Sequence, residues 1–473
     1  APGSDSSQLY EFTPIKGTLT QSQKLYYQYN VNTSSGLGEA FAFLVLISGN
    51  ICNQPSAKEL AQNNASLTVY YSFNSSIYTN LATSQMAVFE NGYFEALVDV
   101  PVDNENGLNT LYIVVQAPEN TNKTIEWSYQ IGVSQNGLVY QWDDRTWSGL
   151  VDTDENSALI VTGNLSMYSQ EMNYSSANAL ELSNYHLYIY PGDYQEHFEL
   201  YNRSWCAVQN GPYLFLDSDF QTSYTFRNGG LQQQFYITGL NSSTEYLAYL
   251  LLDNDKGNYG GILYEPVKFT TMDYDACELI YDLEFCDRVA YSVPALSNMT
   301  KDEISMKYDL QAKELYQNFL KALQQTACNT TDNAKFSPLN SCENCAMSYK
   351  NWLCAVTIPR CLTHNVTGYK FRAVGESRSD FINTVIQPDN EYYEVMPCIG
   401  VCNAIVRDCP ADLGFQCPRK NSSITESYYW DLEDTEYALC NYLGSVLVTS
   451  SGASLILVNW GLTATLVTVL LFA

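Results

Sequence analysis

Three cysteines in the segment 396–417, MPCIGVCNAIVRDCPADLGFQC, constrain the fold of this chain most strongly. Cys398, Cys402 and Cys409 are spaced i, i+4 and i+11, so a helix through them carries all three on one face, together with Val406. The proline that follows Cys409 cannot continue a helix, so we expect the helix to end there. Three cysteines on one inward face predict a helix that is cross-linked to its surroundings.

Either zinc or disulfides could make these cross-links. Cys342 and Cys345 form a C-x-x-C pair, a spacing that suits zinc. Twelve N-x-S/T sequons argue against zinc, because so many indicate passage through the secretory pathway, where thiols oxidise. We therefore predict disulfides. The sequons, which are also the predicted N-glycosylation sites, are at Asn32, Asn64, Asn74, Asn122, Asn164, Asn173, Asn202, Asn241, Asn298, Asn329, Asn365 and Asn421.

The cysteines are concentrated in the C-terminal part of the chain. Only Cys52 and Cys206 precede residue 270, and the sequence leaves their partners open. The other twelve allow six bridges, and the sequence does not choose among the pairings. They are Cys277, Cys286, Cys328, Cys342, Cys345, Cys354, Cys361, Cys398, Cys402, Cys409, Cys417 and Cys440.

The charge balance excludes one class of partner. Among 473 residues, 51 are acidic and 23 are basic, which gives a net charge of −28. Such a chain offers no basic patch, so we expect no nucleic-acid partner. Hydrophobic residues still make up 46% of the chain, as in a folded protein and unlike an acidic disordered tail. Because the sequence starts at Ala1, we interpret its beginning as a processed N-terminus.

Residues 1–140 are predicted to form a β-sandwich-like domain. The segment contains many β-branched and aromatic runs and no helical pattern. Asn91-Gly92 suits a two-residue type I′ hairpin turn. The apolar run 41–48 is too short to cross a bilayer, so we expect a central strand there.

Residues 141–273 are predicted to form a second β-sandwich. The segment ITGLNSSTEYLAYLLL resembles the corner of fibronectin type III domains, in which a leucine starts the corner and a tyrosine six residues later hydrogen-bonds back to it. Leu240 and Tyr246 have that spacing. The acidic run 253–257 suggests calcium, but Gly257 and Asn258 stand where an EF-loop needs a ligand and a glycine, so we expect a tight turn.

Residues 274–441 are predicted to form a disulfide-rich helical domain. Thr300 and Glu303 form a capping box that starts a long helix running to Cys328. A second helix is expected from Cys345 to about Val356, and the 398–409 helix follows.

Residues 442–473 are predicted to be a linker and a hydrophobic membrane tether. The run 455–473 carries no charge, and its 19 residues are just enough to cross a bilayer. Small residues at 444–445 or 450–452 also suit a GPI-attachment signal. Either interpretation places the folded body outside the cell, held at the membrane.

Enzymatic chemistry finds little support in the sequence. The three histidines, His186, His197 and His364, occur in no metal-binding motif, and no G-x-S-x-G or phosphate-loop motif is present. A glycosidase would need only two carboxylates, and acidic clusters occur at 143–144, 152–155 and 431–434. We interpret these clusters as solvated loops. We therefore expect no enzyme, no cofactor and no metal site, and we favour a binding function.

Three segments resemble the cysteine-rich domain of frizzled receptors, and they occur in the same order as there. They are CELIYDLEFCDRVAYSVP (277–294), CAMSYKNWLCAVTIPRC (345–361) and MPCIGVCNAIVRDCP (396–410). Together with the tyrosine-rich β half and the short hydrophobic end, the whole chain resembles the Mid-type subunit of the fungal stretch-activated, high-affinity calcium channel. The resemblance implies a plasma-membrane protein with a large four-repeat pore-forming partner. It also implies a role in calcium influx under mating-pheromone, mechanical or endoplasmic-reticulum stress, with some of the protein in the endoplasmic reticulum.

Apart from the run 455–473, the apolar runs of the chain have the length of strands and are too short to cross a bilayer. We therefore expect an auxiliary subunit that docks on a pore-forming protein and does not form a pore itself. The candidate contacts are groups expected to be exposed beside bridges of the cysteine-rich domain: Arg360, Asn403, Arg407 and Asp408. The alternatives are a GPI-anchored adhesion or receptor glycoprotein without a channel partner, and a secreted carbohydrate-active enzyme.

Overall fold

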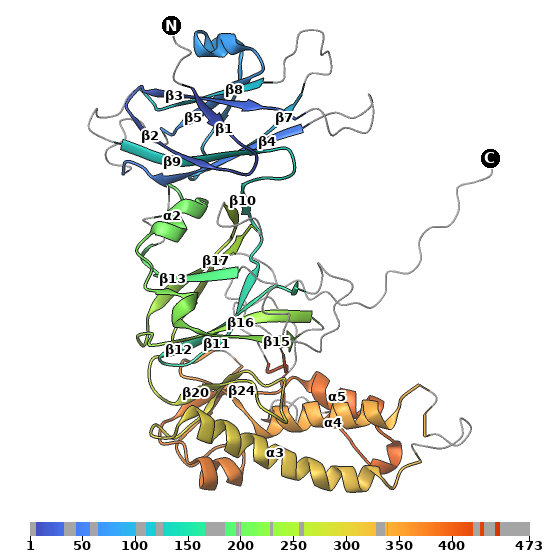
Figure 1. The fold of residues 1–473 in the computed structure, drawn as a ribbon. Helices are drawn as coiled ribbons and strands as arrows, with labels where there is room; N and C mark the ends of the chain where they lie inside the picture. Colours follow the sequence, from blue (N-terminus) through green and yellow to red (C-terminus); the bar gives the residue numbers. More distant parts are fainter. Residues whose placement is uncertain are drawn as a thin grey trace, which may run out of the picture.

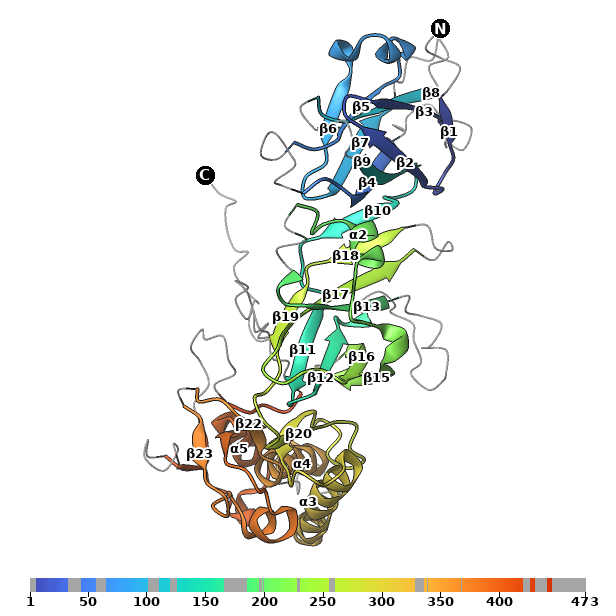
Figure 2. The same cartoon turned by 90° about the vertical axis from the view of Figure 1, so that its left-hand side faces the viewer.

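The computed structural model consists of three bodies stacked end to end: two β-sandwiches and a cysteine-rich block that contains most of the helix (Figure 1). A view from the side shows the same order along one long axis (Figure 2). The described residues are 6–32, 44–56, 65–100, 110–119, 126–165, 185–194, 198, 200–227, 230–254, 260–327, 336–337, 339–366, 368–419, 426–429 and 440–444.

The first sandwich packs a five-stranded sheet on a four-stranded one. The five-stranded sheet has the order β1 (Ser7–Leu9), β3 (Lys24–Asn30), β8 (Thr110–Gln116), β5 (Thr68–Ser72) and β6 (Gln85–Val88). The four-stranded sheet has the order β2 (Ile15–Thr20), β9 (Glu126–Ser134), β4 (Leu44–Asn53) and β7 (Tyr93–Asp99). Alternate side chains of both sheets, such as Val45, Ile113 and Trp127, are fully buried between them. The central strand predicted around residues 41–48 is therefore present as β4, although residues 41–43 lie outside the described part.

The predicted Asn91-Gly92 turn is confirmed, but the strands on its two sides, β6 and β7, belong to different sheets and are joined only by the Glu90–Tyr93 bridge. The φ angles of Asn91 and Gly92 are +52° and +82°, and a type I′ turn needs positive values at both central residues. The backbone N–H groups of Glu90 and Tyr93 each donate to the other residue's carbonyl, at 2.8 and 3.1 Å.

The second sandwich packs a six-stranded sheet on a four-stranded one. The six-stranded sheet has the order β10 (Tyr140–Asp143), β18 (Gly261–Tyr264), β17 (Glu245–Asp253), β13 (Tyr185–Pro191) and β14 (Phe215–Leu216), and β19 (Val267–Thr270) also pairs with β17. The four-stranded sheet has the order β11 (Ser148–Thr153), β12 (Ser157–Thr162), β16 (Gly230–Thr238) and β15 (Gln221–Arg227). Inward side chains of both sheets form one core.

The predicted tyrosine corner is also confirmed. Leu240 is buried, and the backbone N–H of the next residue, Asn241, donates to the Tyr246 hydroxyl oxygen at 2.8 Å. From Tyr246 the strand β17 alternates between two buried faces. Tyr246, Ala248 and Leu250 face the sandwich core. The residues of β17 that alternate with them pack on the other side of the strand, in a second cluster with the short helix α2 (Trp205–Asn210). Burial on both faces explains why this strand is apolar throughout.

The cysteine-rich block, defined here as the described residues from 277 to 443, surrounds its helices with short strands. A hairpin of β20 (Cys277–Ile280) and β21 (Tyr291–Pro294) precedes the helices α3 (Lys301–Leu323), α4 (Cys342–Thr357) and α5 (Ile399–Asp408). A small sheet has the order β22 (Arg360–Leu362), β24 (Tyr392–Val395) and β23 (Lys370–Arg372), and a π-helical turn spans Ile382–Ile386.

Capping residues determine where the helices α3 and α4 begin. The Thr300–Glu303 capping box is present, as predicted. Helix α3 ends at Leu323 and not near Cys328, because Leu323 is its last buried apolar side chain and two glutamines and a threonine follow it. Helix α4 begins three residues earlier than predicted, because the Ser341 side chain accepts a hydrogen bond from the Asn344 backbone N–H and caps it there.

Within the described residues, no helix combines the length and the apolar character needed to cross a bilayer. The predicted tail at 455–473 and its candidate attachment points at 445 and 450–452 lie outside the described residues.

Candidate functional site: the cysteine-rich block and its junction with the second sandwich

Disulfides cross-link the cysteine-rich block, as predicted. Helix α5 is tied to three different segments, through Cys398–Cys440, Cys402–Cys417 and Cys345–Cys409. Two more bridges, Cys277–Cys361 and Cys286–Cys354, connect the β20–β21 region to β22 and α4. Cys342 is also disulfide-bonded, whereas Cys328 lies outside the described residues. With Cys342 and Cys345 both oxidised, their C-x-x-C pair supplies no thiolates for zinc.

The face of α5 that points inward differs in one residue from the prediction. Val406 is 47% exposed, and Ile405 is buried in its place. Ile405 follows Cys398 by seven residues, which is close to two full turns, whereas Val406 is one residue further and falls at the edge of the cysteine stripe. The inward stripe of α5 is therefore Cys398, Cys402, Ile405 and Cys409.

Of the residues proposed as partner contacts, Asn403 and Arg407 are exposed on α5. Asp408 is buried, contrary to the prediction, because its side chain turns toward α4, where the Ser348 hydroxyl donates to it at 2.5 Å. Arg407 also donates to Asp408, at 2.6 Å, and this contact lowers the pKa of the Asp408 carboxyl. The guanidinium of Arg407 thus remains accessible while its partner carboxylate is fixed against the core.

Arg360 is not the exposed group that the sequence suggested, since only 2% of it is exposed. Its Nε donates to the Asp152 carboxylate of β11 at 2.9 Å, and its Nη2 donates to the Val151 carbonyl at 3.1 Å. Asp152 is 1% exposed and also accepts the Ser292 backbone N–H at 3.1 Å. This buried ion pair joins the second sandwich to the cysteine-rich block.

Asp154 forms a second buried connection at the same junction. Its carboxylate accepts the backbone N–H groups of Asn156 and Ser157 and the Ser157 hydroxyl, which fixes the β11–β12 turn. It also accepts the Leu279 backbone N–H of β20, at 3.1 Å. The acidic cluster at 152–155 is therefore no solvated loop, because Asp152 and Asp154 serve as acceptors for the neighbouring body.

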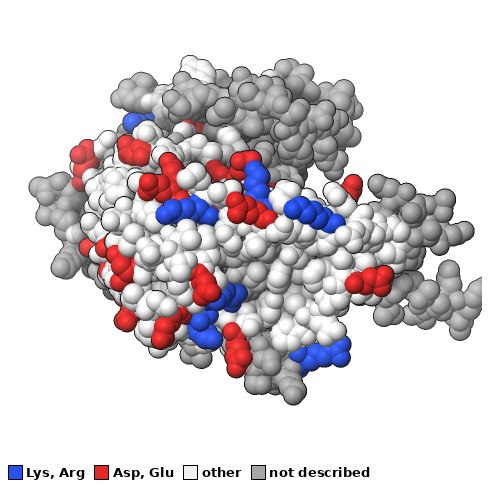
Figure 3. Space-filling model, turned by 90° about the horizontal axis from the view of Figure 1, so that it is seen from below, with Lys and Arg blue, Asp and Glu red and all other residues white. Residues whose placement is uncertain are grey.

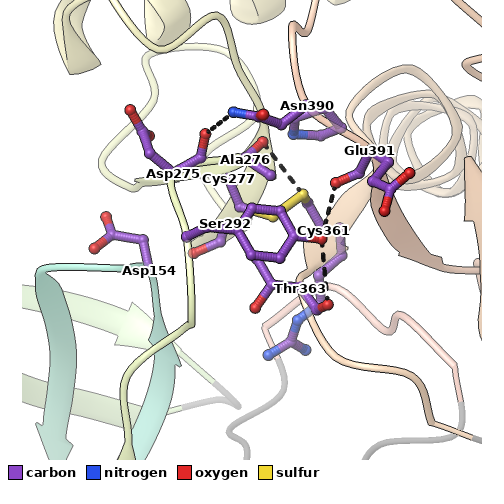
Figure 4. The surroundings of a disulfide bond; sticks show 12 residues. Asp154, Asp275, Ala276, Cys277, Ser292, Cys361, Thr363, Asn390 and Glu391 are labelled. Carbon is purple, nitrogen blue, oxygen red and sulfur yellow. Dashed lines mark hydrogen bonds between the residues drawn. A yellow bond between two sulfur atoms is a disulfide. The ribbon is translucent and has the colours of Figure 1, made fainter. Parts of the chain in front are cut away.

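Figure 4 shows that Asp154 lies beside the Cys277–Cys361 bridge. This bridge holds β20 against β22, and Arg360 is the residue next to Cys361. Nearby, the Asn390 amide donates to the Asp275 carbonyl at 2.7 Å. The disulfide therefore links β20 and β22, two of the strands that present partners to the second sandwich.

An aromatic clamp also contributes to the junction. The Lys301 ammonium lies 3.5 Å from the ring centroids of both Tyr236, on β16, and Tyr281, after β20. Burial lowers the pKa of Lys301 to about 8. Beside it, burial and the neighbouring Asp154 raise the pKa of Glu278 to about 7. No local sequence motif predicts these contacts, because the residues that meet here are far apart along the chain.

The junction between the two sandwiches is covalent. Cys52 at the end of β4 pairs with Cys206 in α2, which answers the pairing that the sequence left open. Around it, the Ser204 hydroxyl donates to the Ile51 carbonyl at 2.6 Å, and the Trp205 backbone N–H donates to the Asn50 side chain at 3.1 Å. The three bodies are thus joined by specific contacts at both junctions.

Seven of the predicted glycosylation asparagines are described, and none of them is buried. Asn32, Asn74, Asn241, Asn298 and Asn365 are exposed, and Asn164 and Asn202 are partly buried. The other five, Asn64, Asn122, Asn173, Asn329 and Asn421, lie outside the described residues. Glycosylation stays a prediction.

No cluster of histidine, cysteine or carboxylate side chains suited to a metal ion occurs among the described residues. Residues 255–258 of the suggested calcium loop lie outside them. Asp253 at its start faces His186, with 3.2 Å between the carboxylate and the ring Nε2.

Comparison with known proteins identifies the family. Residues 44–446 match the family model Mid1, described as a stretch-activated Ca²⁺-permeable channel component. The stretch-activated cation channel MID1 of Saccharomyces cerevisiae is 37% identical, over 93% of this chain and 88% of the relative. The stretch-activated cation channel yam8 of Schizosaccharomyces pombe is 32% identical, over 90% of this chain and 93% of the relative.

Similarity to solved structures is slight. The fibronectin domains FN1–FN3 of chicken CNTN1 align with 46% of this chain and 60% of that chain at 9% identity, with a TM-score of 0.15. The sequence relationships, in contrast, extend over nearly the whole chain. The chain belongs to the Mid1 family of stretch-activated cation-channel components.

Proposed function

We propose that this chain is an extracellular, glycosylated regulatory subunit of a plasma-membrane calcium channel. It docks on a separate four-repeat pore-forming subunit and is required with it for calcium influx under mating-pheromone, mechanical or endoplasmic-reticulum stress. The observation that carries this proposal is the match of residues 44–446 to a family of channel components. The two relatives are named as stretch-activated cation channels and the family as a channel component, and these names describe no enzyme.

The way in which the chain uses its apolar segments supports an auxiliary role over a pore-forming one. The apolar runs of β4 and β17 pair with neighbouring strands, and their side chains are buried in the sandwich cores. A pore would need such segments in contact with lipid. The hydrophobic tail at 455–473 is proposed to hold the folded body at the membrane, as a GPI signal or a single span.

We further propose that residues 274–441 form a frizzled-like domain and present the docking surface. The bridges around α5 hold its exposed side chains in a fixed arrangement, and a rigid surface loses less entropy on binding. Asn403 and Arg407 remain the candidate contacts on this surface. Arg360 and Asp408 would act indirectly, by holding the surface in place.

Affinity purification of the chain from solubilised plasma membrane, with mass spectrometry of the recovered proteins, tests the proposal. We expect a large four-repeat channel subunit at a near one-to-one ratio. Recovery of the chain alone, or with wall proteins only, would support a GPI-anchored adhesion glycoprotein. Recording from the purified chain in bilayers gives a second test, and clean single-channel currents would contradict an auxiliary role.

A further inference from the structure

A groove of about 610 Å³ lies where the second sandwich meets the cysteine-rich block. One wall is the outward side of α3, from Lys301 to Lys313. The opposite walls are the turn 281–284 after β20 and the first residue of β15, Gln221. Grooves at the junction of two folded bodies are preferred places for ligands and partner segments.

Apolar side chains are exposed along the α3 wall. Met306 and Leu310 are 64% and 52% exposed, and they lie one turn apart on the same face of the helix. Helix α3 packs on its own block through other residues, such as Ile304, Tyr308 and Ala312. The Met306–Leu310 face is therefore not needed for the core of the block, and exposed apolar side chains within a groove mark a contact site.

The groove has an excess of negative charge. Four acidic residues line it, against two lysines. Lys301 is held between two tyrosine rings, and Lys313 is paired with Glu284 at 3.0 Å. Asp282 and Asp302 are exposed, and both lie close to Lys301. A complementary partner would carry lysine or arginine beside apolar side chains.

The walls are fixed in place before any partner arrives. The Asp309 carboxylate on α3 accepts the backbone N–H groups of Phe285 and Cys286, at 2.8 and 2.7 Å, and so holds the turn 281–284 against the helix. The Cys286–Cys354 bridge anchors the same turn to α4. A preformed groove binds with a smaller entropy cost than a mobile one.

One predicted glycosylation site, the exposed Asn298, lies three residues before Lys301, near the start of α3. None of the twelve N-x-S/T sequons falls in β15, in the turn 281–284 or in α3. Seen from the end of the molecule that carries the cysteine-rich block, much of the described surface is uncharged, with small groups of acidic and basic side chains (Figure 3). Because an N-glycan is bulky, the sequon-free part of α3 around Met306 and Leu310 is the part suited to protein contact.

We propose that this groove binds an extracellular segment of the pore-forming subunit that presents apolar side chains flanked by lysine or arginine. The inference rests on the proposed function. It places a docking site on α3 and the 281–284 turn, away from the candidate contacts Asn403 and Arg407 on α5. Apolar contact with Met306 and Leu310 supplies the affinity, and Asp282 and Asp302 select the charge of the partner.

Paired variants in the full-length chain test the groove. Met306→Asp with Leu310→Asp should lower recovery of the pore-forming subunit by about tenfold or more, because two apolar contacts are lost and negative charge is added. Leu315→Asp is the matched control, because Leu315 is 39% exposed on the same helix but does not line the groove. It should leave recovery unchanged.

Charge and proximity are tested separately. Asp302→Lys should also lower recovery, whereas Glu314→Lys, on α3 but outside the groove, should not. A photo-crosslinking residue at position 306 should capture the pore-forming subunit, and one at position 315 should not. Because crosslinking needs no destabilising change, it stays informative even where an aspartate variant folds poorly.

The outcomes separate the two proposals. If the unaltered chain recovers no pore-forming subunit, the proposed function fails. If it does recover that subunit, but the groove variants recover as much as their controls, only the groove proposal is overturned. Crosslinking from position 306 to a second copy of this chain, or to lipid, also overturns it.

Discussion

Removal of Arg360 should loosen the junction between the second sandwich and the cysteine-rich block. Its guanidinium gives one hydrogen bond to Asp152 and one to the Val151 carbonyl. Asp152 is 1% exposed in the intact protein, and without Arg360 its carboxylate would keep only the backbone N–H groups of Ser292 and Thr153. Breaking a buried ion pair by removing one partner typically costs about 3–5 kcal/mol. We expect Arg360→Met to cost this much.

Amide hydrogen exchange of the purified chain is the appropriate assay, because a protein with three folded bodies need not unfold in a single step. Peptides covering β20 and β21 report opening of this junction. A loss of about 3–5 kcal/mol corresponds to exchange that is faster by roughly 10²–10⁴-fold. Lys350→Ala is the control, since it breaks the partly exposed Lys350–Asp287 pair, 2.7 Å long, which should contribute about 0–1 kcal/mol.

A double-mutant cycle separates the ion pair from simple loss of packing. Asp152→Asn keeps an oxygen for the Ser292 N–H but removes the charge, so the double variant Arg360→Met/Asp152→Asn should be less destabilised than the sum of the single variants, by about 2 kcal/mol. Additive effects, or exchange in β20 and β21 that Arg360→Met leaves unchanged, would refute the reasoning.

Three other perturbations have distinct expected results. Cys398→Ala or Cys409→Ala should each remove a bridge, at a typical cost of about 2–5 kcal/mol, and block maturation; normal surface levels with normal calcium uptake would contradict this. Because the pKa of Glu278 is raised from 4.5 to about 7, the folded chain binds more protons there than the unfolded chain, so this group's contribution to stability falls as the pH rises from 4.5 to 7. Glu278→Gln should abolish this pH dependence of the melting temperature between pH 4.5 and 7. An unchanged pH dependence in the variant would contradict the raised pKa of Glu278. Gly92→Ala should cost about 1–3 kcal/mol in thermal unfolding, because its φ is positive and a Cβ would lie 2.5 Å from Tyr201 Cβ; an unchanged melting temperature would count against it.

Features set by neighbouring residues were predictable from the sequence. The Asn91-Gly92 turn, the Thr300–Glu303 cap and the Tyr246 corner each depend on residues within six positions of one another. Their residue types allow few other conformations, so the local pattern was sufficient. The same holds for the expectation that α5 would be cross-linked through its cysteines.

Features set by distant residues were not predictable. Arg360 and Asp152 are separated by 208 positions, and an arginine beside a cysteine has the same local pattern whether it is buried or exposed. For the same reason the sequence assigned Asp152 and Asp154 to solvent, although both accept hydrogen bonds from the cysteine-rich block. The pairing of Cys52 with Cys206 likewise depended on the sandwiches being in place.

The two junctions differ in how they would carry tension along the molecule. Between the sandwiches, a pulling force passes through the chain and through the Cys52–Cys206 bond in parallel. Between the second sandwich and the cysteine-rich block, no disulfide spans the junction within the described part of the chain, and non-covalent contacts share the load with the segment 271–276. We expect the second junction to yield first, as an early short step in single-molecule force traces. Under tension, the contacts around the buried Arg360–Asp152 pair would then be the first to separate.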